Sequence, residues 1–109
     1  MAETIKVLGQ SAPSATTDTD LYTVPGASSA IISTIVIANR DNADATYNIA
    51  VRPSGATIAN EHYLAFNVTV GGNDSTSLTL GITMASTDVL TVQASNDNLT
   101  FNAFGSEIS

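Results

Sequence analysis

The feature that most constrains this chain is an alternation of apolar and polar residues with a period of two. This alternation recurs along the chain in segments that are separated by turn residues spaced roughly ten residues apart. In residues 46–52, for example, Tyr47, Ile49 and Val51 alternate with polar neighbours. Successive side chains of a β-strand point to opposite faces, so this pattern predicts a strand with one buried face. Helical periodicity is almost absent, and we expect an all-β chain of seven or eight strands.

Strand patterns occupy most of the remaining sequence. We expect further strands at Thr4–Leu8, Asp20–Val24, Ile31–Ala38, 63–70, 78–82, Val89–Ala94 and 99–103. Residues 31–38 carry apolar side chains at positions of both parities, which predicts a central strand covered on both faces. Residues 63–70 place Leu64, Phe66, Val68 and Val70 on a single apolar face.

Turn residues separate these segments. Pro25–Gly26 predicts a type II turn in which Gly26 takes the positive φ. Gly71–Asp74 predicts a hairpin, and Asn96–Asn98 predicts a second one. At Phe104–Gly105 the apolar parity of the last strand changes, which indicates a bulge or a side chain offered to a partner.

The length of 109 residues suits one domain, spanning residues 1–109. Seven or eight antiparallel strands favour a β-sandwich. The chain contains neither Trp nor Cys, so the hallmarks of an immunoglobulin domain are missing. We therefore expect a jelly-roll-like sandwich, with an immunoglobulin-like one as the alternative. Residues 11–20 are rich in small polar residues and contain Pro13, so they are expected to form a loop or an extended arm.

Charge excludes several classes of partner. The net charge is -7, with only three basic residues, so a basic patch that binds nucleic acid is not expected. An acidic chain also avoids anionic membranes, and no apolar run approaches the roughly 20 residues of a spanning helix. Charged residues make up only 12% of the chain. Neutral outer faces desolvate at low cost, which favours contact with other subunits.

No group of residues in the sequence predicts a catalytic or metal-binding site. The one histidine, His62, has no nucleophile context beside it, so we expect no catalytic residues and no enzyme activity. Asp18 with Asp20, and Asp41 with Asp44, place carboxylates close together, but neither pair matches a calcium loop. Asx turns explain both pairs, so we expect no metal site and no cofactor.

A carbohydrate-binding, lectin-like module is the alternative from another functional class. Such sites in β-sandwiches use exposed aromatic side chains, and the sequence offers Tyr22, Tyr47 and Tyr63. Parity turns Tyr47 inward, which leaves Tyr63 and Tyr22 as the available platforms.

Three stretches resemble a known group of proteins. They are Asp20-Leu-Tyr-Thr-Val-Pro25, the apolar strand from Ile31 to Asn39-Arg40, and Tyr47-Asn-Ile-Ala-Val-Arg52-Pro53. This series is similar to small β-rich structural proteins of tailed bacteriophages. The resemblance is clearest over residues 20–53 and reaches more loosely to the closing residues 104–108.

The resemblance implies a virion component, and first a capsid decoration (cement) protein that stabilises the phage head. Such proteins sit as trimers or other clusters on the capsid lattice, so the implied partners are further copies of this chain and the major capsid protein. A tail, baseplate or fibre subunit is the alternative, although no repeats of a fibre shaft are visible. The start, Met1–Lys6, has no secretory pattern, so assembly in the host cytoplasm and location in the virion are expected.

No functional residues transfer with this resemblance, because its motifs are strand and turn patterns. We select Tyr63, Phe104 and Ile108 as the candidate interface residues.

Overall fold

The computed structural model describes residues 2–109, so Met1, the first residue of the expected domain, lies outside the described residues. Strands make up 59% of the chain, and residues 2–109 contain two short 3-10 turns, at Pro53–Gly55 and Asn60–His62, but no α-helix. The nine strands are β1 (Glu3–Ser11), β2 (Thr19–Thr23), β3 (Ser29–Asn39), β4 (Ala45–Arg52), β5 (Tyr63–Val70), β6 (Ser75–Leu78), β7 (Ile82–Met84), β8 (Val89–Ala94) and β9 (Leu99–Ile108).

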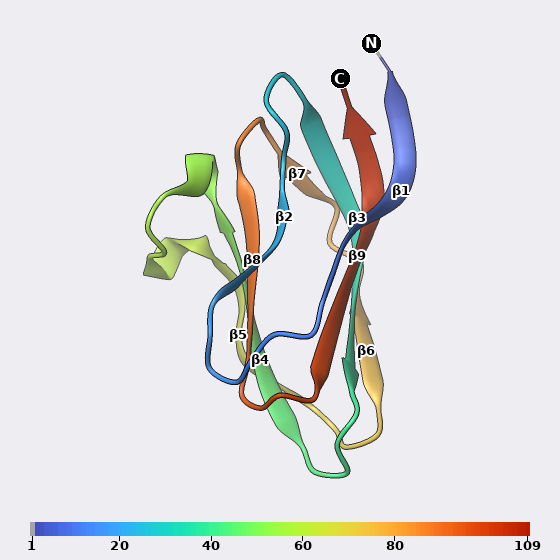
Figure 1. The fold of residues 1–109 in the computed structure, drawn as a ribbon, viewed down its shortest axis with the longest axis vertical. Helices are drawn as coiled ribbons and strands as arrows, with labels where there is room; N and C mark the ends of the chain where they lie inside the picture. The colour runs from blue at the N-terminus through green and yellow to red at the C-terminus, as the bar shows by residue number, and fades with distance from the viewer. Residues whose placement is uncertain (1) are drawn as a thin grey trace.

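The strands form two antiparallel sheets packed face to face (Figure 1). Sheet A has the order β1-β9-β3-β6, with β7 also paired to β3, and sheet B has the order β2-β8-β4-β5. Most connections cross from one sheet to the other, and this winding is that of a jelly roll. The predicted all-β, jelly-roll-like sandwich is confirmed. An immunoglobulin-like order, with its ABED and CFG sheets, is not found.

The core lies between the sheets and consists of the inward-facing side chains of both. The largest fully buried side chains are Phe101, Ile32, Ile35, Ile37, Ile49, Met84, Leu90, Leu99, Val24 and Val92. Tyr47 of sheet B meets Phe101 of sheet A edge to face, with ring centroids 6.3 Å apart. Complete burial of one such side chain contributes about 1.5–3 kcal/mol. The inward positions predicted for Tyr47, Leu90 and Val92 are confirmed.

β3 is central in sheet A, as predicted, but it is covered on one face only. Ile32, Ile35 and Ile37 are fully buried, whereas Ile31 on the opposite face is 39% exposed. A strand of a two-sheet sandwich has one face toward the core, and sheet B covers only that inner face of β3. The apolar residues of the second parity therefore lie on the surface of the molecule.

Both predicted hairpins are corners between the sheets. Gly71–Asp74 leads from β5 in sheet B to β6 in sheet A, and Asn96–Asn98 leads from β8 to β9. Turn residues indicate where a chain reverses but not which strand it pairs with next. At the first corner the Gly72 backbone comes so close to Asn42 that a Cβ atom would lie 2.4 Å from the Asn42 carbonyl oxygen. Gly72 is required by this approach.

The turn at Pro25 is displaced by one residue from its predicted position. The Ser28 amide donates to the Pro25 carbonyl oxygen at 3.2 Å, so Pro25 is the first residue of the turn. The positive φ then falls on Ala27, at 65°, rather than on Gly26. The reason is that the Val24 amide donates to the Asp88 carbonyl oxygen at 3.0 Å, which delays the turn.

A β-bulge in β5 overturns the single apolar face predicted for residues 63–70. Tyr47 pairs with Val68 but Ile49 pairs with Ala65, so β5 has one extra residue opposite Asn48. The bulge changes the parity of the strand. Phe66 is consequently 62% exposed, and Leu64 is exposed as well.

The predicted strand over residues 78–82 is also interrupted. β6 ends at Leu78 and β7 begins at Ile82, and both pair with β3. Gly81, with φ of 64°, lies in the interruption. This edge of sheet A is therefore two short pieces rather than one continuous strand.

Residues 12–18, within the stretch expected to be a loop or arm, connect β1 to β2. The Thr16 amide donates to the Ala94 carbonyl oxygen at 2.7 Å, and the Ala15 amide donates to Asp97 Oδ1 at 2.6 Å. These bonds hold the connection against the end of β8 and the corner that follows it.

Candidate interaction face on sheet A

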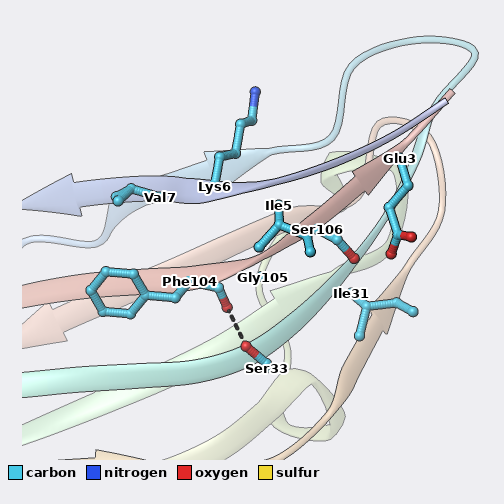
Figure 2. A pocket seen from close by; sticks show the side chains of 9 residues that line it. All are labelled: Glu3, Ile5, Lys6, Val7, Ile31, Ser33, Phe104, Gly105 and Ser106. Atoms are coloured by element: carbon cyan, nitrogen blue, oxygen red, sulfur yellow. Dashed lines mark hydrogen bonds between the residues drawn. The ribbon is translucent and has the colours of Figure 1, made fainter.

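The outward face of sheet A has an apolar centre. Ile5 and Val7 of β1 are 84% and 48% exposed, and Ile31 of β3 is also exposed. Strand register brings these residues together with β9, because Val7 lies opposite Phe104, and both Ile5 and Ile31 lie opposite Ser106. Figure 2 shows the four apolar side chains around one shallow hollow of about 440 Å³. Three strands thus build a single apolar surface.

Bulges in the two neighbouring strands frame Phe104. The register shifts once in β1, between Val7 and Gly9, and once in β3, between Ile32 and Thr34. The hydroxyl of Ser33, the extra residue of β3, donates to the Phe104 carbonyl oxygen at 3.0 Å. Of the two alternatives predicted for Phe104–Gly105, a bulge within β9 is not found, and the Phe104 side chain faces outward between the buried Ala103 and Gly105. The irregularity belongs to the neighbours of β9.

This face is almost free of charge. The five strands of sheet A contain three ionisable side chains, Glu3, Lys6 and Glu107. Lys6 points away from the hollow in Figure 2, and its ammonium pairs with Glu107 at 3.1 Å. Of the two ionisable residues that line the hollow, Lys6 is thus paired and Glu3 remains beside the apolar side chains. A neutral apolar face can be covered by another protein without burying an unpaired ion.

A hydrogen-bonded tie joins the sheets at the end where both termini lie. The Tyr22 hydroxyl of β2 donates to Glu107 Oε2 at 2.5 Å, and Lys6 holds the other carboxylate oxygen. The hydrogen bond from Tyr22, followed by that from Lys6, lowers the pKa of Glu107. Burial and the bond to Glu107 raise the pKa of Tyr22 far above its ordinary value. The tie fixes β1 and β9 where they form one side of the hollow.

The part of the outward face of sheet B built by β2, β8 and β4 has the opposite character. Arg52, the last residue of β4, donates to Thr91 Oγ1 at 3.0 Å, to Asp20 Oδ1 at 2.9 Å and to the carbonyl oxygens of Gly55 and Ala56. A second chain of bonds runs along the same face, as Asn48 donates to Gln93 and Gln93 donates to Asp18. Because these polar groups satisfy one another, covering them would gain less than covering sheet A.

The three candidate interface residues lie on two different sheets. Phe104 and Ile108 share the outward side of β9, and both are half-buried. Tyr63 begins β5 in sheet B, where its ring packs against Phe66 at a centroid distance of 4.9 Å. The structure therefore brings Phe104 and Ile108 to the apolar face and leaves Tyr63 away from it.

Ile5, Val7 and Ile31 were not selected from the sequence, although they form most of this face. The signal was present, because residues 4–8 place Ile5 and Val7 on one side of a strand. Nothing in the alternation indicates that this side faces away from the core. The side of β1 that is turned away from sheet B decides it, and that follows from topology.

Residues that suggested other chemistry have structural roles. His62 accepts a hydrogen bond from the Ala59 amide through Nδ1 at 3.0 Å, closing a 3-10 turn. Asp41 accepts from the Asn42 amide, and Asp44 accepts from the Gly72 amide. Residues 2–109 contain no cluster of three or more His, Cys, Asp or Glu side chains suited to a metal ion. Tyr22, considered as an exposed platform for a sugar, is buried.

No protein-family model matches the chain, and no curated sequence matches it significantly. Within residues 2–109, no helix has the length and apolar character needed to cross a bilayer.

Proposed function

We propose that this chain is a structural subunit of a tailed-phage virion that works by packing the outward face of sheet A against other subunits. The main observation that supports this proposal is the apolar, nearly uncharged surface built by Ile5, Val7, Ile31 and Phe104. Monomeric proteins seldom leave such a patch on a regular sheet uncovered. The bacteriophage-like stretch over residues 20–53 supports the virion as its location.

Among virion positions, we propose capsid decoration. The chain would bind as a homo-oligomer to the major capsid protein and hold neighbouring capsomers together. A jelly roll suits this task because its rigid sheets present a preformed face, so little ordering entropy is lost on binding. The fold alone does not assign the function, since jelly rolls also serve as lectin domains. The character of the face supports the structural role.

Rebinding to particles that lack this protein tests the proposal. Purified protein is expected to bind capsids, and Ile31→Glu is expected to weaken binding because it places an unpaired charge in the contact. Thr69→Glu is the matched control, since Thr69 is exposed on β5 of sheet B. Binding to tails but not heads would replace decoration with a tail or baseplate role.

Particle rebinding combined with a glycan array separates the carbohydrate-binding alternative from the structural role. The Tyr63–Phe66 pair, in which Phe66 is exposed and Tyr63 is half-buried, is the aromatic surface that supports this alternative. Binding to a glycan array that is lost in Phe66→Ala, together with no binding to heads or tails, would overturn the structural proposal. A hydrolytic activity lost in His62→Ala would overturn both.

A further inference from the structure

The open edge of sheet A is the first half of β1, and its hydrogen-bonding groups can be assigned. The Ala2 amide donates to Ser109 at 2.7 Å, and the Ser109 amide donates back to Ala2 at 2.8 Å. In an antiparallel ladder such doubly bonded pairs alternate with unbonded ones. Thr4 and Lys6 therefore bond to β9, and Glu3, Ile5 and Val7 point their backbone groups toward the open edge.

The open edge is short and has defined limits. It ends at the β1 bulge near Leu8. Immediately beyond, the Gly9 backbone approaches the Leu21 carbonyl oxygen so closely that a Cβ atom would lie 2.1 Å from it. Residues 3–7 contain no proline, and Ile5 and Val7 on their outward side are exposed. Native proteins usually protect an edge of this kind, because it is a template for another strand.

We propose that this edge pairs in antiparallel fashion with the same edge of a second copy, about a two-fold axis at Ile5. In this register Ile5 faces Ile5 of the second copy, and Glu3 faces Val7 of the second copy. All of these are residues whose backbone groups point outward, so each becomes a doubly bonded pair. The two apolar hollows then join into one surface across the junction. The inference rests on the proposed self-contact and assigns its edge, register and symmetry.

The distribution of charge makes the β1 edge the favourable position for contact with a second copy. Each chain has a net charge of -7, so two copies repel one another over most of their surfaces. Apart from Glu3 and Glu107, the acidic residues lie on sheet B or on the turns and connections. Pairing at β1 therefore keeps most of the negative charge away from the junction. The register also places Thr4 opposite Lys6, whereas a two-fold axis at Lys6 would oppose two ammonium groups.

The other edge of sheet A explains why the contact closes on itself. Head-to-tail growth would require β1 to pair with β6 and β7, and these are short pieces interrupted around Gly81. Short, broken edge strands resist addition. The suitable partner for the continuous β1 edge is therefore the β1 edge of a second copy. Two identical edges that pair about a two-fold axis form a closed dimer.

Single cysteines test the register, because the chain has no cysteine of its own. Doubly bonded antiparallel pairs have Cα atoms about 5.5 Å apart, within the range of a disulfide. Ile5→Cys is expected to form a covalent dimer on mild oxidation, and Val7→Cys is not, because it faces Glu3 of the second copy. Phe66→Cys controls for random collision at an exposed site. Equal cross-linking of all three, or cross-linking through Val7→Cys alone, would overturn the register.

The mass in solution tests the pairing itself. Light scattering on the unmodified chain is expected to give twice the 11.2 kDa of one chain. Ile5→Lys is expected to abolish the dimer because it opposes two ammonium groups at the axis, while Leu80→Lys, on the opposite edge, leaves it intact. A monomer or a trimer would overturn the inference but leave particle binding untouched. A dimer that binds no particles would overturn the proposed function and leave the pairing standing.

Discussion

The Tyr22 hydroxyl donates a 2.5 Å hydrogen bond to the Glu107 carboxylate across the gap between the two sheets. Tyr22 belongs to β2 in sheet B, and Glu107 lies near the end of β9 in sheet A. Lys6 of β1 completes the contact at 3.1 Å, so three strands meet at one carboxylate. The edge that we propose for self-association therefore depends on a group that titrates.

Acid is expected to weaken this end of the sandwich. The ordinary pKa of the Glu107 carboxyl is 4.5, and its hydrogen bonds lower that value in the folded chain. A lowered folded pKa contributes stability above the unfolded value, and this contribution is lost as the pH falls through the folded value. As the pH is lowered below 4.5, the denaturation midpoint should therefore decrease less steeply in Glu107→Gln than in the unmodified chain. Glu3→Gln, at the same end of sheet A, is the control.

Alkali acts on the other partner of the tie. Burial first, and then the bond to Glu107, raise the pKa of Tyr22 above its ordinary value of 10.0. A raised folded pKa contributes stability that is complete below the unfolded value and is lost as the pH rises beyond it. Unfolding midpoints followed upward from pH 10 should decline less in Tyr22→Phe than in the unmodified chain. Parallel curves for the two proteins would contradict this assignment.

Alternation and turn chemistry predicted the fold class because they report local physics. The period-two pattern around Tyr47, Ile49 and Val51 identified β4 and its buried side, and the missing Trp and Cys favoured a jelly roll. What the pattern lacked was long-range information. Gly71–Asp74 and Asn96–Asn98 have the residues of hairpins, yet the strands they join belong to different sheets.

The candidate face depended even more on topology. The local sequence does not distinguish Ile31 from the buried isoleucines of β3. Ile31 is exposed because it lies on the outer side of sheet A. The bulge at Asn67 turned Phe66 outward, and it depends on the Asn67 amide donating to Asn48 Oδ1 at 2.7 Å. A single side chain on a neighbouring strand thus changes the parity, which no local pattern within β5 reveals.

Gly105 is expected to tolerate no side chain. A Cβ atom there would lie 2.0 Å from the Ile31 carbonyl oxygen, because the β3 bulge brings that backbone over β9. Gly105→Ala should lower the free energy of unfolding by about 1–3 kcal/mol, the usual cost of overpacking. Gly26→Ala is the matched control, since nothing lies within 4 Å of its Cβ position. Equal denaturation midpoints for the two variants would show that β3 can shift at no cost.

Arg52 is expected to hold the connection between β4 and β5 through the shape of its guanidinium group. Its Nη1 donates to the carbonyl oxygens of Gly55 and Ala56 at 3.1 and 2.9 Å, while Nε and Nη2 reach Thr91 and Asp20. A lysine keeps the charge but has one nitrogen, so it cannot reach all four groups.

Arg52→Lys should therefore lower the free energy of unfolding by about 1.5–3 kcal/mol, the range for hydrogen bonds to a charged group. Amide exchange within residues 53–62 should accelerate more than exchange in β8. Arg40→Lys is the control, because Arg40 makes one exposed side-chain bond, to the Asp97 carbonyl oxygen at 3.1 Å. If both substitutions have the same small effect, the charge alone matters and the fork geometry of Arg52 contributes nothing.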